Sequence, residues 1–463
     1  MPAALGGEAA AARDARRERE HREAVLRAKI ARQIARLDGA ISRQLEAVLG
    51  SPELRRLESA WRGLRYLVHA AEEAGGDVEI AVLAVGWAEI ARDVMNAVEF
   101  DRSQMFAKIY SEAIGTAGGA PFGVVLVDHE FAAATHTPTG HRELEVVERL
   151  AGIAAAAFCP IILGTSPRML GLESFSELSG RLQPSPFLTG SPTYLKWRSF
   201  RSSPDARFIS LTMPRVLMRR SRRHDEPAAP GFGLRLRAEG GALWGSPIYA
   251  HGAVLIRCFS DSGFFLDIRG VRVGEGGAGL VPGLPLETFS VDRAGVCTKP
   301  VTEAPVDDAL ERRLAVEGFN VLCDLPHGPY AAFFGDSTLN KPAQYDRDGA
   351  TMSARFESQL RHVLSASRIA IALYVRTRAK IGSFVEAEVL ESELNEWLSG
   401  FVLLGHDPTQ RERAERPYAE ASVLVERGDL PGTYRMTMRL KPLPEYDGLV
   451  GALTLTTDRI ETS

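Results

Sequence analysis

The stretch "FGVVLVD" (Phe122 to Asp128) is one of two apolar runs that flank a helical pattern, and this arrangement decides the fold class. The second run, "PIILGTS", occupies residues 160–166, and residues 141–158 between them have the spacing of an amphipathic helix. Nearly continuous apolar runs joined through a helix are typical of parallel strands that are buried on both faces. The sequence therefore predicts a mixed α/β (α+β) fold whose partly parallel sheet is flanked by helices.

The alternation of strands and helices extends in both directions from this unit. Residues 78–85 ("VEIAVLAV") are expected to form another strand, with helices following at 87–98 and 102–114. Residues 180–240 are rich in Pro, Ser and Arg and are expected to be irregular. Beyond them we expect a helix at 243–262, short strands to about 335, and two consecutive helices near 350–380 and 383–404. Residues 50–355 are predicted to form the α/β body.

Residues 1–49 are predicted to form an N-terminal helical arm. The segment 8–49 lacks Pro, is rich in Ala and Arg, and is followed by a second helix at 53–76 that ends at a Gly-Gly pair. Apolar residues recur at steps of three or four and form one stripe along the first helix: Leu26, Ile30, Ile34, Leu37, Ile41, Leu45 and Val48. Such a stripe stays exposed unless another helix covers it, so the arm is predicted to need a partner.

Three strand-like runs lie in the C-terminal part, at 419–426, 433–441 and 449–457. In "TYRMTMRLKPLP" (Thr433 to Pro444) apolar and polar residues alternate, as in a half-buried strand. Such a small sheet has edges that can accept a strand of another chain. The residues predicted to take part in this pairing are Tyr434, Arg435, Met436, Thr437, Met438, Arg439, Leu440, Leu453 and Leu455. Residues 356–463 are predicted to be a C-terminal helix and β domain.

Composition and charge favour a globular protein without a nucleic-acid partner. The chain has 463 residues, and its 55 basic and 59 acidic side chains are too balanced to attract a phosphate backbone. The longest apolar run, 153–164, falls short of the about 18 residues that span a bilayer, so we expect no membrane insertion and a cytoplasmic location. Four separated cysteines are expected to be buried in a reducing compartment: Cys159, Cys258, Cys297 and Cys323.

The candidate cofactor and metal sites each have a simpler interpretation. The string "GEGGAG" (Gly274 to Gly279) matches Gly-x-Gly-x-x-Gly, but Pro282 and Pro285 prevent the helix that a dinucleotide fingerprint must open, so a flexible turn is favoured. Three histidines lie near one another in sequence without regular ligand spacing and are interpreted as ordinary loop or surface residues: His129, His136 and His141. The common P-loop, zinc and serine-nucleophile motifs are absent. We therefore expect no cofactor, no metal and no catalytic activity.

Two charged clusters are also open to a functional interpretation. A solvated loop is favoured over phosphate binding for a basic run without interleaved aromatics: Arg219, Arg220, Arg222 and Arg223. The predicted helix near 383–404 carries five acids: Glu386, Glu388, Glu391, Glu393 and Glu396. These spacings spread the carboxylates over much of the polar surface, which favours a solvated face and leaves a charged docking face as the alternative.

Longer stretches of the sequence are distinctive as an ordered set. They are "LESAWRGLRYLV" (57–68), "FDRSQMFAKIYSEAIGTAGGAPFGVVLVD" (100–128), "SPTYLKWRSFRSSPDARFISLTMPRVLMR" (191–219), "YAAFFGDSTLNKPAQYD" (330–346) and "ASRIAIALYVRTRAKIGSF" (366–384). With the tail from "RPYAEASVLVE" to "GTYRMTMRLKP", they resemble the large subunit of the type VI secretion contractile sheath, the TssC/VipB/ImpC family. The resemblance runs from about residue 50 to the end.

This resemblance implies a structural, mechanical protein of a Gram-negative bacterium. In the family, the large subunit pairs with a small sheath subunit of the TssB/VipA type, and the heterodimers form a helical polymer around an inner tube of Hcp. Contraction propels the tube through a baseplate into a target cell. The resemblance further implies that the C-terminal strands join those of neighbouring subunits, and that Glu388, Glu391 and Glu396 face the tube. An AAA+ recycling ATPase recognises an early helix of a longer arm in the family; the arm here is short and rich in Arg and Ala.

Two other interpretations compete with this one. The chain could be a sheath-like protein of a phage tail or an extracellular contractile injection machine, or an α/β enzyme whose site has no recognisable motif. A neighbouring reading frame that encodes a short acidic partner would argue against the enzyme. Assembly with Hcp rather than with a phage tube protein would argue against the other sheaths.

Overall fold

The structure is a computed structural model that describes most of the chain. Two compact units are present, residues 1–59 with 219–243 and residues 60–218 with 244–463. Side chains are described from residue 16 onward, except those of residues 290, 296–297 and 453–460. The backbone is described for residues 3–75, 78–116, 119–137, 140–178, 194–221, 241–271, 277–290, 296–325, 330–378, 386–403, 405, 408–427, 434–443 and 453–460.

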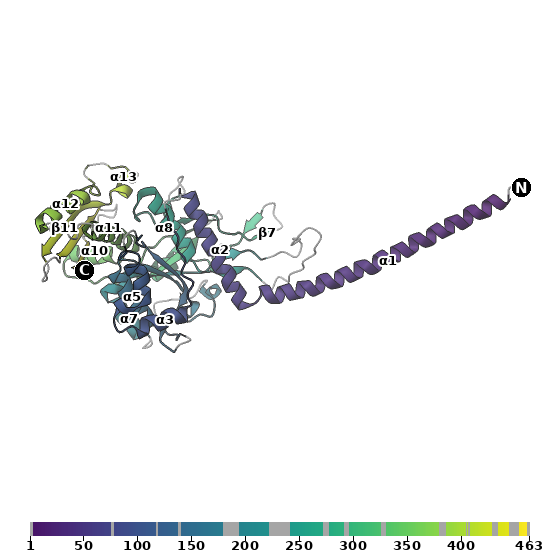
Figure 1. Cartoon of the computed structure of the whole chain (residues 1–463), viewed down its shortest axis with the longest axis horizontal. Coiled ribbons are helices and arrows are strands. Elements are labelled where there is room, and N and C mark those ends of the chain that lie inside the picture. The colour runs from purple at the N-terminus through teal and green to yellow at the C-terminus, as the bar shows by residue number, and fades with distance from the viewer. Residues whose placement is uncertain are drawn as a thin grey trace. The chain divides into compact units, whose positions relative to one another are not determined.

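A six-stranded mixed sheet forms the core of the second unit, in the order β1-β2-β3-β9-β10-β6. Figure 1 shows helices of this unit, among them α3, α5, α7 and α8, gathered around its strands. The strands β1, β2, β3 and β9 are parallel to one another, whereas β10 pairs antiparallel with both β9 and β6. Their bounds are β1 (Val125–Phe131), β2 (Ile161–Thr165), β3 (Ile209–Met213), β9 (Phe319–Asp324), β10 (Ala331–Phe333) and β6 (Leu280–Val281). The predicted fold class, with parallel strands at 122–128 and 160–166, is confirmed.

Helices cover both faces of this sheet, which explains why its strands read as continuous apolar runs. Ile161 and Leu163 of β2 belong to a core that also includes buried residues of α3 (Trp87–Asn96), α5 (Glu143–Ala156), α7 (Leu195–Arg201) and α9 (Asp308–Val316). The other face contacts α8 (Ile248–Ser262), where a Cβ on Gly252 would lie 2.6 Å from Leu126 Cδ1 of β1. Gly252 therefore allows the close approach of α8 to the sheet.

One central strand, β3, was missed by the sequence analysis, which expected residues 180–240 to be irregular. Its apolar run is interrupted by Ser210 and Thr212, although every residue of the strand is buried. Both hydroxyls find partners inside the core: Thr212 Oγ1 donates to the Leu163 carbonyl at 3.1 Å, and Asn320 Nδ2 donates to Ser210 Oγ at 2.6 Å. These bonds remove the cost of burying the polar groups.

The strand predicted at 78–85 is absent from the structure. Within the described ranges, residues 78–86 have no ladder partner and form an irregular segment that leads into α3. Apolar β-branched residues favour a strand, but a strand needs a neighbour to pair with. The prediction for this segment was therefore wrong for the isolated chain.

Several of the remaining helices follow the prediction with shifted boundaries. The helix predicted at 102–114 was wrong, because residues 100–111 form a succession of short helical elements, and α9 lies where only short strands were expected. The helices predicted at 8–49 and 53–76 are α1 (Ala3–Leu49) and α2 (Pro52–Glu73). The one predicted at 350–380 is two helices, α10 (Asp348–Glu357) and α11 (Leu360–Arg378), and the next is α12 (Ala387–Ser399). Shorter elements are η1 (Phe100–Arg102), α4 (Gln104–Phe106), η2 (Ala107–Ser111), η3 (Pro167–Leu170), η4 (Phe175–Leu178), η6 (Pro204–Phe208), α13 (Gln410–Glu415), β4 (Val216–Arg219), β5 (Leu243–Gly245), β7 (Thr288–Ser290) and β8 (Val296–Thr298).

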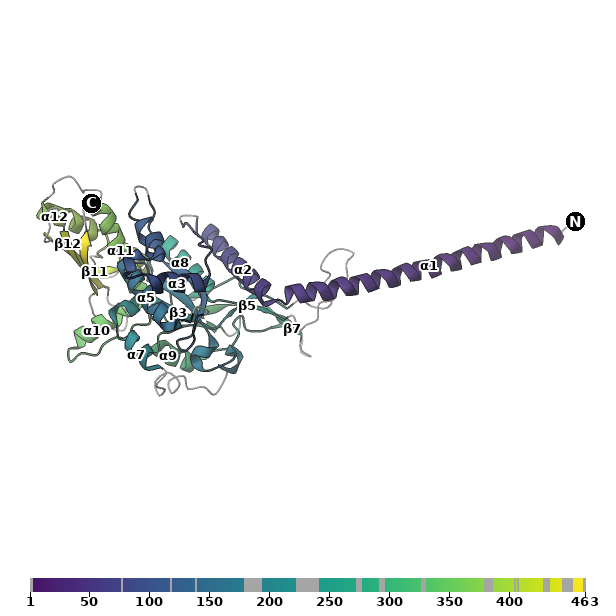
Figure 2. The same ribbon diagram turned by 60° about the horizontal axis from the view of Figure 1, so that its bottom comes forward.

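The C-terminal strands form a separate antiparallel sheet, as predicted. Its strands are β11 (Tyr418–Arg427), β12 (Tyr434–Pro442) and β13 (Leu453–Ile460), with β12 in the middle. Figure 2 shows α12 lying against this sheet, with α11 nearby.

A buried histidine makes the fold sensitive to acid. His251 of α8 is fully buried and stacks on Phe333 of β10, with ring centroids 4.6 Å apart. Burial lowers the pKa of the His251 imidazole to about 4, while the nearby Asp336 carboxylate opposes this change. The unfolded chain therefore binds a proton at this residue below pH 6.5 that the folded chain does not. Stability that is present above this pH is lost as the pH falls toward 4.

We predict that His251→Phe, which preserves the stacked ring, reduces this acid sensitivity. Between pH 7 and pH 4.5, the wild-type chain should lose about 2 kcal/mol of unfolding free energy through His251, and the variant should not. Urea unfolding at the two pH values measures the difference. The matched control is His21→Gln on the exposed side of α1, which should leave the pH dependence unchanged. An equally steep acid loss in His251→Phe would show that other groups cause it.

Candidate functional site

The apolar face of the C-terminal sheet is covered by the chain itself. Met436, Met438 and Leu440 of β12 are buried, while Arg435 and Arg439 on the other face are exposed, as the alternation predicted. The three apolar side chains belong to a cluster with residues of α11, α12 and β11: Ala366, Ile369, Ala370, Leu373, Ala387, Leu390, Leu394, Leu398, Tyr418, Val423 and Val425. The apolar side chains on this face of β11 and β12, the two strands whose side chains are described, are therefore covered without a partner.

The main chain of β12 is also used within the chain. Thr437 lies opposite Leu424 of β11 on one side and Thr456 of β13 on the other. The other two predicted pairing residues, Leu453 and Leu455, lie in β13 opposite Leu440 and Met438, and their side chains fall outside the described residues. Only the outer edges of β11 and β13 could accept a further strand. That this sheet is shared between chains stays a prediction.

The acidic residues of α12 divide into two groups. Glu388 and Glu396 are exposed, as are Glu386 and Glu393. Glu391 is half-buried, and its Oε2 accepts a hydrogen bond from the Val425 N–H of β11 at 2.9 Å. Glu391 therefore joins α12 to β11, while the exposed Glu388 and Glu396 remain available to another molecule.

The stripe predicted on α1 is largely exposed. Leu26, Ile30, Ile34, Leu37 and Ile41 are all exposed, and only Leu45 is half-buried. Leu26, Leu37 and Val48 follow one another at intervals of eleven residues, which keeps the stripe nearly parallel to the helix axis. A row of large apolar side chains of this length is typical of a surface that packs against another helix.

The segment 78–85 is a second exposed apolar surface. Val82 is 66% exposed and Leu83 is 53% exposed, and Val85 is also exposed. Exposed apolar residues in succession mark a contact surface far more often than a single one does. This segment and the α1 stripe lie in different units of the chain, so they are independent candidates.

The groups considered for chemistry have structural partners. His129 stacks on Trp87 with centroids 4.0 Å apart, and its Nε2 lies 3.2 Å from Glu143 Oε1. His136 and Arg142 form an isolated β-bridge, and His141 lies between them in the chain. Within the described ranges, no group of three or more His, Cys, Asp or Glu residues is arranged to hold a metal ion. The His129 side chain therefore packs within the fold, whereas His136 is an exposed residue.

The prediction that the basic run is a solvated loop was wrong for Arg219. Arg219 lies at the end of β4, where its Nε donates to Glu58 Oε1 at 2.8 Å and its side chain is only 11% exposed. Arg222 and Arg223 lie outside the described residues.

The string "GEGGAG" is described only in part. Gly274 to Gly276 lie outside the described residues, and Gly279 is followed by the strand β6. A strand at this position agrees with the expected loss of the helix that nucleotide binding requires.

The cysteines have inert surroundings where their side chains are described. Cys159, Cys258 and Cys323 are free and buried, and burial raises the pKa of the Cys159 thiol to about 12. The side chain of Cys297 lies outside the described residues. A thiol with such a raised pKa is a poor nucleophile at neutral pH.

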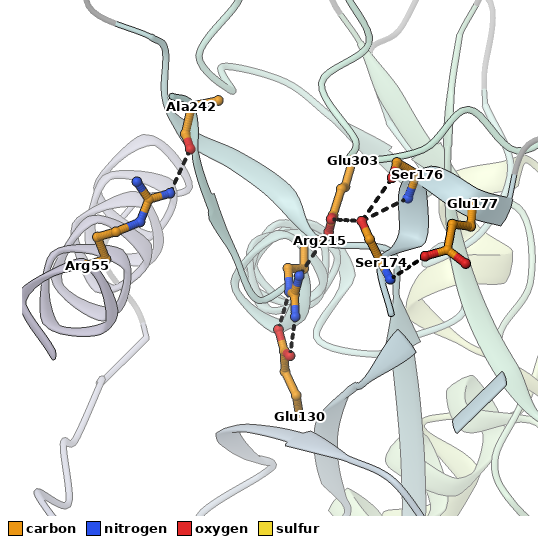
Figure 3. A network of polar contacts seen from close by, with 8 residues as sticks. All are labelled: Arg55, Glu130, Ser174, Ser176, Glu177, Arg215, Ala242 and Glu303. Atoms are coloured by element: carbon orange, nitrogen blue, oxygen red, sulfur yellow. Dashed lines mark hydrogen bonds and ion pairs between the residues drawn. The ribbon is translucent and has the colours of Figure 1, made fainter. Parts of the chain in front are cut away.

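An arginine that the sequence analysis did not single out joins two acids (Figure 3). Arg215 Nη2 donates to Glu130 Oε2 at 2.7 Å, and Nη1 donates to Glu303 Oε2 at 3.2 Å. Ser174 Oγ donates to the other oxygen of Glu303 at 2.9 Å. The hydrogen bonds to Glu130 raise the pKa of Arg215 above its ordinary value. Because both carboxylates are bound to a permanent cation, this group ties β1 to two loops and has no free acid or base.

Figure 3 also shows the hydrogen bond that Arg55 of α2 donates to the Ala242 carbonyl, at 2.9 Å. Both residues belong to the first unit.

No helix in the described part of the chain is long and apolar enough to cross a bilayer.

Comparison with known proteins first defines the class. Residues 31–340 match the VipB family, described as the EvpB/VC_A0108 tail sheath N-terminal domain, and residues 349–459 match the EvpB/VC_A0108 tail sheath gpW/gp25-like domain. The chain is thus a tail-sheath protein. It is 34% identical over 432 residues to the type VI secretion system sheath protein TssC1 of Pseudomonas aeruginosa strain PAO1, across 91% of this chain and 84% of the relative. The chain belongs to the TssC/VipB family of type VI secretion sheath large subunits.

This membership confirms the resemblance seen in the sequence. The protein is a contractile sheath subunit, and its family is structural and non-enzymatic. Sheath proteins work in assemblies, so family membership implies assembly partners. The exposed surfaces described above are candidates for contacting them.

We predict that the two faces of the C-terminal sheet differ sharply in their tolerance to truncation. Met438→Ala should lower the unfolding free energy by about 2–5 kcal/mol, because it leaves a cavity beneath β12. Leu424→Ala, the matched control on β11, should cost about 0.5 kcal/mol or less, because that side chain is 49% exposed. Thermal and urea unfolding of both variants measure the difference. Equal losses would mean that α11 and α12 do not cover the sheet as described.

Proposed function

We propose that this chain pairs with a small sheath subunit of the TssB/VipA type and that the heterodimers form a helical polymer around an inner tube of Hcp. Contraction of the polymer propels the tube through the baseplate and into a target cell. We further propose that assembly takes place in the cytoplasm of a Gram-negative bacterium. The observation that carries the proposal is the run of exposed apolar residues at 78–85 in a chain that has a large buried core.

The chemistry of this segment favours a strand as its partner. Val82 and Val85 are β-branched, and the Val85 N–H donates to the Leu83 carbonyl at 3.0 Å. A strand from another chain would cover the apolar side chains and supply partners to the extended backbone at the same time. The small subunit is the proposed donor.

The α1 stripe and the C-terminal sheet are proposed to serve other contacts. The stripe from Leu26 to Leu45 would meet a helix of a neighbouring subunit, and the arm is a candidate for recognition by an AAA+ recycling ATPase. The C-terminal sheet would link subunits through shared strands. We propose a matching division of labour among the arm (1–49), the body (50–355) and the C-terminal domain (356–463).

The acidic face of α12 is the proposed contact with the inner tube. Glu388 and Glu396 are exposed, whereas Glu391 is bound to β11 and would contribute less. Exposed ion pairs contribute only about 0.2–1 kcal/mol each, so a tube held by several of them can be released during contraction.

We predict that Leu83→Asp abolishes pairing with the small subunit and leaves the isolated chain folded. The side chain is exposed, so the carboxylate costs little in the free chain, but burying it in an interface would cost several kcal/mol. Co-expression with the small subunit followed by co-purification measures pairing. The matched control is Val316→Asp at the end of α9, which is 75% exposed. If Leu83→Asp co-purifies as well as the control, the segment 78–85 does not form this interface.

We predict that the double reversal Glu388→Lys with Glu396→Lys impairs assembly on Hcp but not pairing with the small subunit. The reason is repulsion where charge complementarity is proposed. The control reverses two exposed acids outside α12, Asp101→Lys with Asp346→Lys, so that the net charge changes equally. Electron microscopy of tubes formed with and without Hcp measures the effect. Normal tubes from the α12 variant would mean that this face is merely solvated.

A further inference from the structure

Helix α2 has two apolar faces, and the first of them is covered by α8. A Cβ on Gly63 would overlap the Tyr249 ring of α8, and a Cβ on Gly252 of α8 would lie 2.8 Å from Leu67 Cδ2. Leu67 and, one turn later, Ala71 are both buried. These two glycines let the helices approach closely, so this side of α2 is fully used within the chain.

The second apolar face of α2 is exposed. Trp61 is 64% exposed and Val68 is 42% exposed, while Leu64 between them is half-buried. The intervals of three and four residues place these side chains in one row, with the spacing of a coiled-coil seam. This row lies about a third of a turn around the helix from the side that packs on α8. A surface helix needs only one apolar stripe to reach its own core, so the second row marks a contact with another molecule.

The charges beside this row are positive around Trp61. Arg62 and Arg65 are exposed and lie within about one turn of Trp61. Glu58, one turn earlier, is bound by Arg219, whose Nε donates to Glu58 Oε1 at 2.8 Å. The next exposed acids of α2 lie in its last turn, beyond the row. A partner helix with acidic residues beside its apolar side would complement this surface, and one with basic residues would be repelled.

Two other occupants fit the row less well. A second copy packed row against row would bring Arg65 of one chain beside Arg65 of the other, and like charges in contact oppose the pairing. An anionic membrane would attract the arginines, but a helix that lies on a membrane needs a broad apolar face. This row is one side chain wide, and the neighbouring face of α2 is buried against α8.

We propose that the exposed row of α2 is a docking surface for an amphipathic helix of a different protein, whose apolar side packs on Trp61, Leu64 and Val68 and whose carboxylates face Arg62 and Arg65. Tryptophan and arginine are the residues that most often dominate the binding energy of an interface, and Trp61 lies between covered and charged sides of the helix. The surface does not include the segment 78–85 that is proposed to bind the small subunit, so either contact can fail without the other.

Two designed helical peptides test the proposal on the full chain. Both carry leucines at heptad spacing on one side, and they differ only in the flanking residues, which are Glu in one peptide and Lys in the other. Each peptide is immobilised on a biolayer interferometry sensor, so that the chain can be kept dilute. The chain should bind the Glu peptide about tenfold or more tightly than the Lys peptide. No binding of the Glu peptide, or equal binding of both peptides, would overturn the proposal.

Variants then locate the binding on α2. Trp61→Ala should weaken binding of the Glu peptide by about tenfold or more, and the position is exposed enough to leave the fold unchanged. Two controls should bind as the wild type does: Tyr345→Ala, which removes another exposed ring, and Leu83→Asp in the segment 78–85. Reversal of both Arg62 and Arg65 to Glu should shift the preference to the Lys peptide. Unchanged binding in Trp61→Ala, or an unchanged preference in the double reversal, would overturn the assignment to this row.

The same Trp61→Ala variant distinguishes the other occupants. Analytical ultracentrifugation measures association of the chain with itself, and flotation with vesicles of phosphatidylcholine and phosphatidylserine measures membrane binding. The substitution should change neither. Self-association that is lost in Trp61→Ala would assign the row to a second copy, and vesicle binding that is lost would assign it to a membrane; either result would overturn the proposal.

Discussion

Burial of one row of apolar side chains organises the C-terminal domain. Met436, Met438 and Leu440 need an apolar cover, and α11 and α12 provide it within the same chain. Once this face is filled, the sheet can add a strand of another molecule only at its edges, and β12 has none because it lies in the middle. A link through main-chain hydrogen bonds fits a contractile sheath well, because such bonds hold strands together while whole subunits rotate as rigid bodies.

Outside this domain, the chain combines a buried core with large apolar side chains that are exposed to solvent. The parallel sheet is buried on both faces, and its polar groups, such as Thr212 and Asn320, have partners inside the core. In contrast, the segment 78–85 and the α1 stripe expose large apolar residues to solvent. A complete core beside uncovered apolar surfaces is typical of a subunit that reaches its final state only in an assembly. The family membership supplies the kind of assembly, a contractile sheath.

The sequence predicted those elements whose signal is local. The alternation in 433–441 predicted both the strand and its buried face, and the apolar runs predicted β1 and β2. Tertiary partners decided the rest. The polar residues Ser210 and Thr212 hid the strand pattern of β3, because the groups that bind their hydroxyls are distant in sequence. Residues 78–85 have the composition of a strand but pair with no strand in the described part of the chain. Likewise, no local sequence pattern predicts that the side chain of Asn395 in α12 donates a hydrogen bond to the Val423 carbonyl of β11, because the two residues lie 28 positions apart.

We propose that this chain is a building block of a contractile tube in which other subunits cover its exposed apolar surfaces. The most direct measurement is negative-stain electron microscopy after co-expression with the small sheath subunit, with each chain expressed alone as the comparison. We expect hollow tubes with a cogwheel cross-section only when both chains are present, and irregular association of this chain by itself. A monodisperse monomer that neither binds the small subunit nor forms tubes would contradict it.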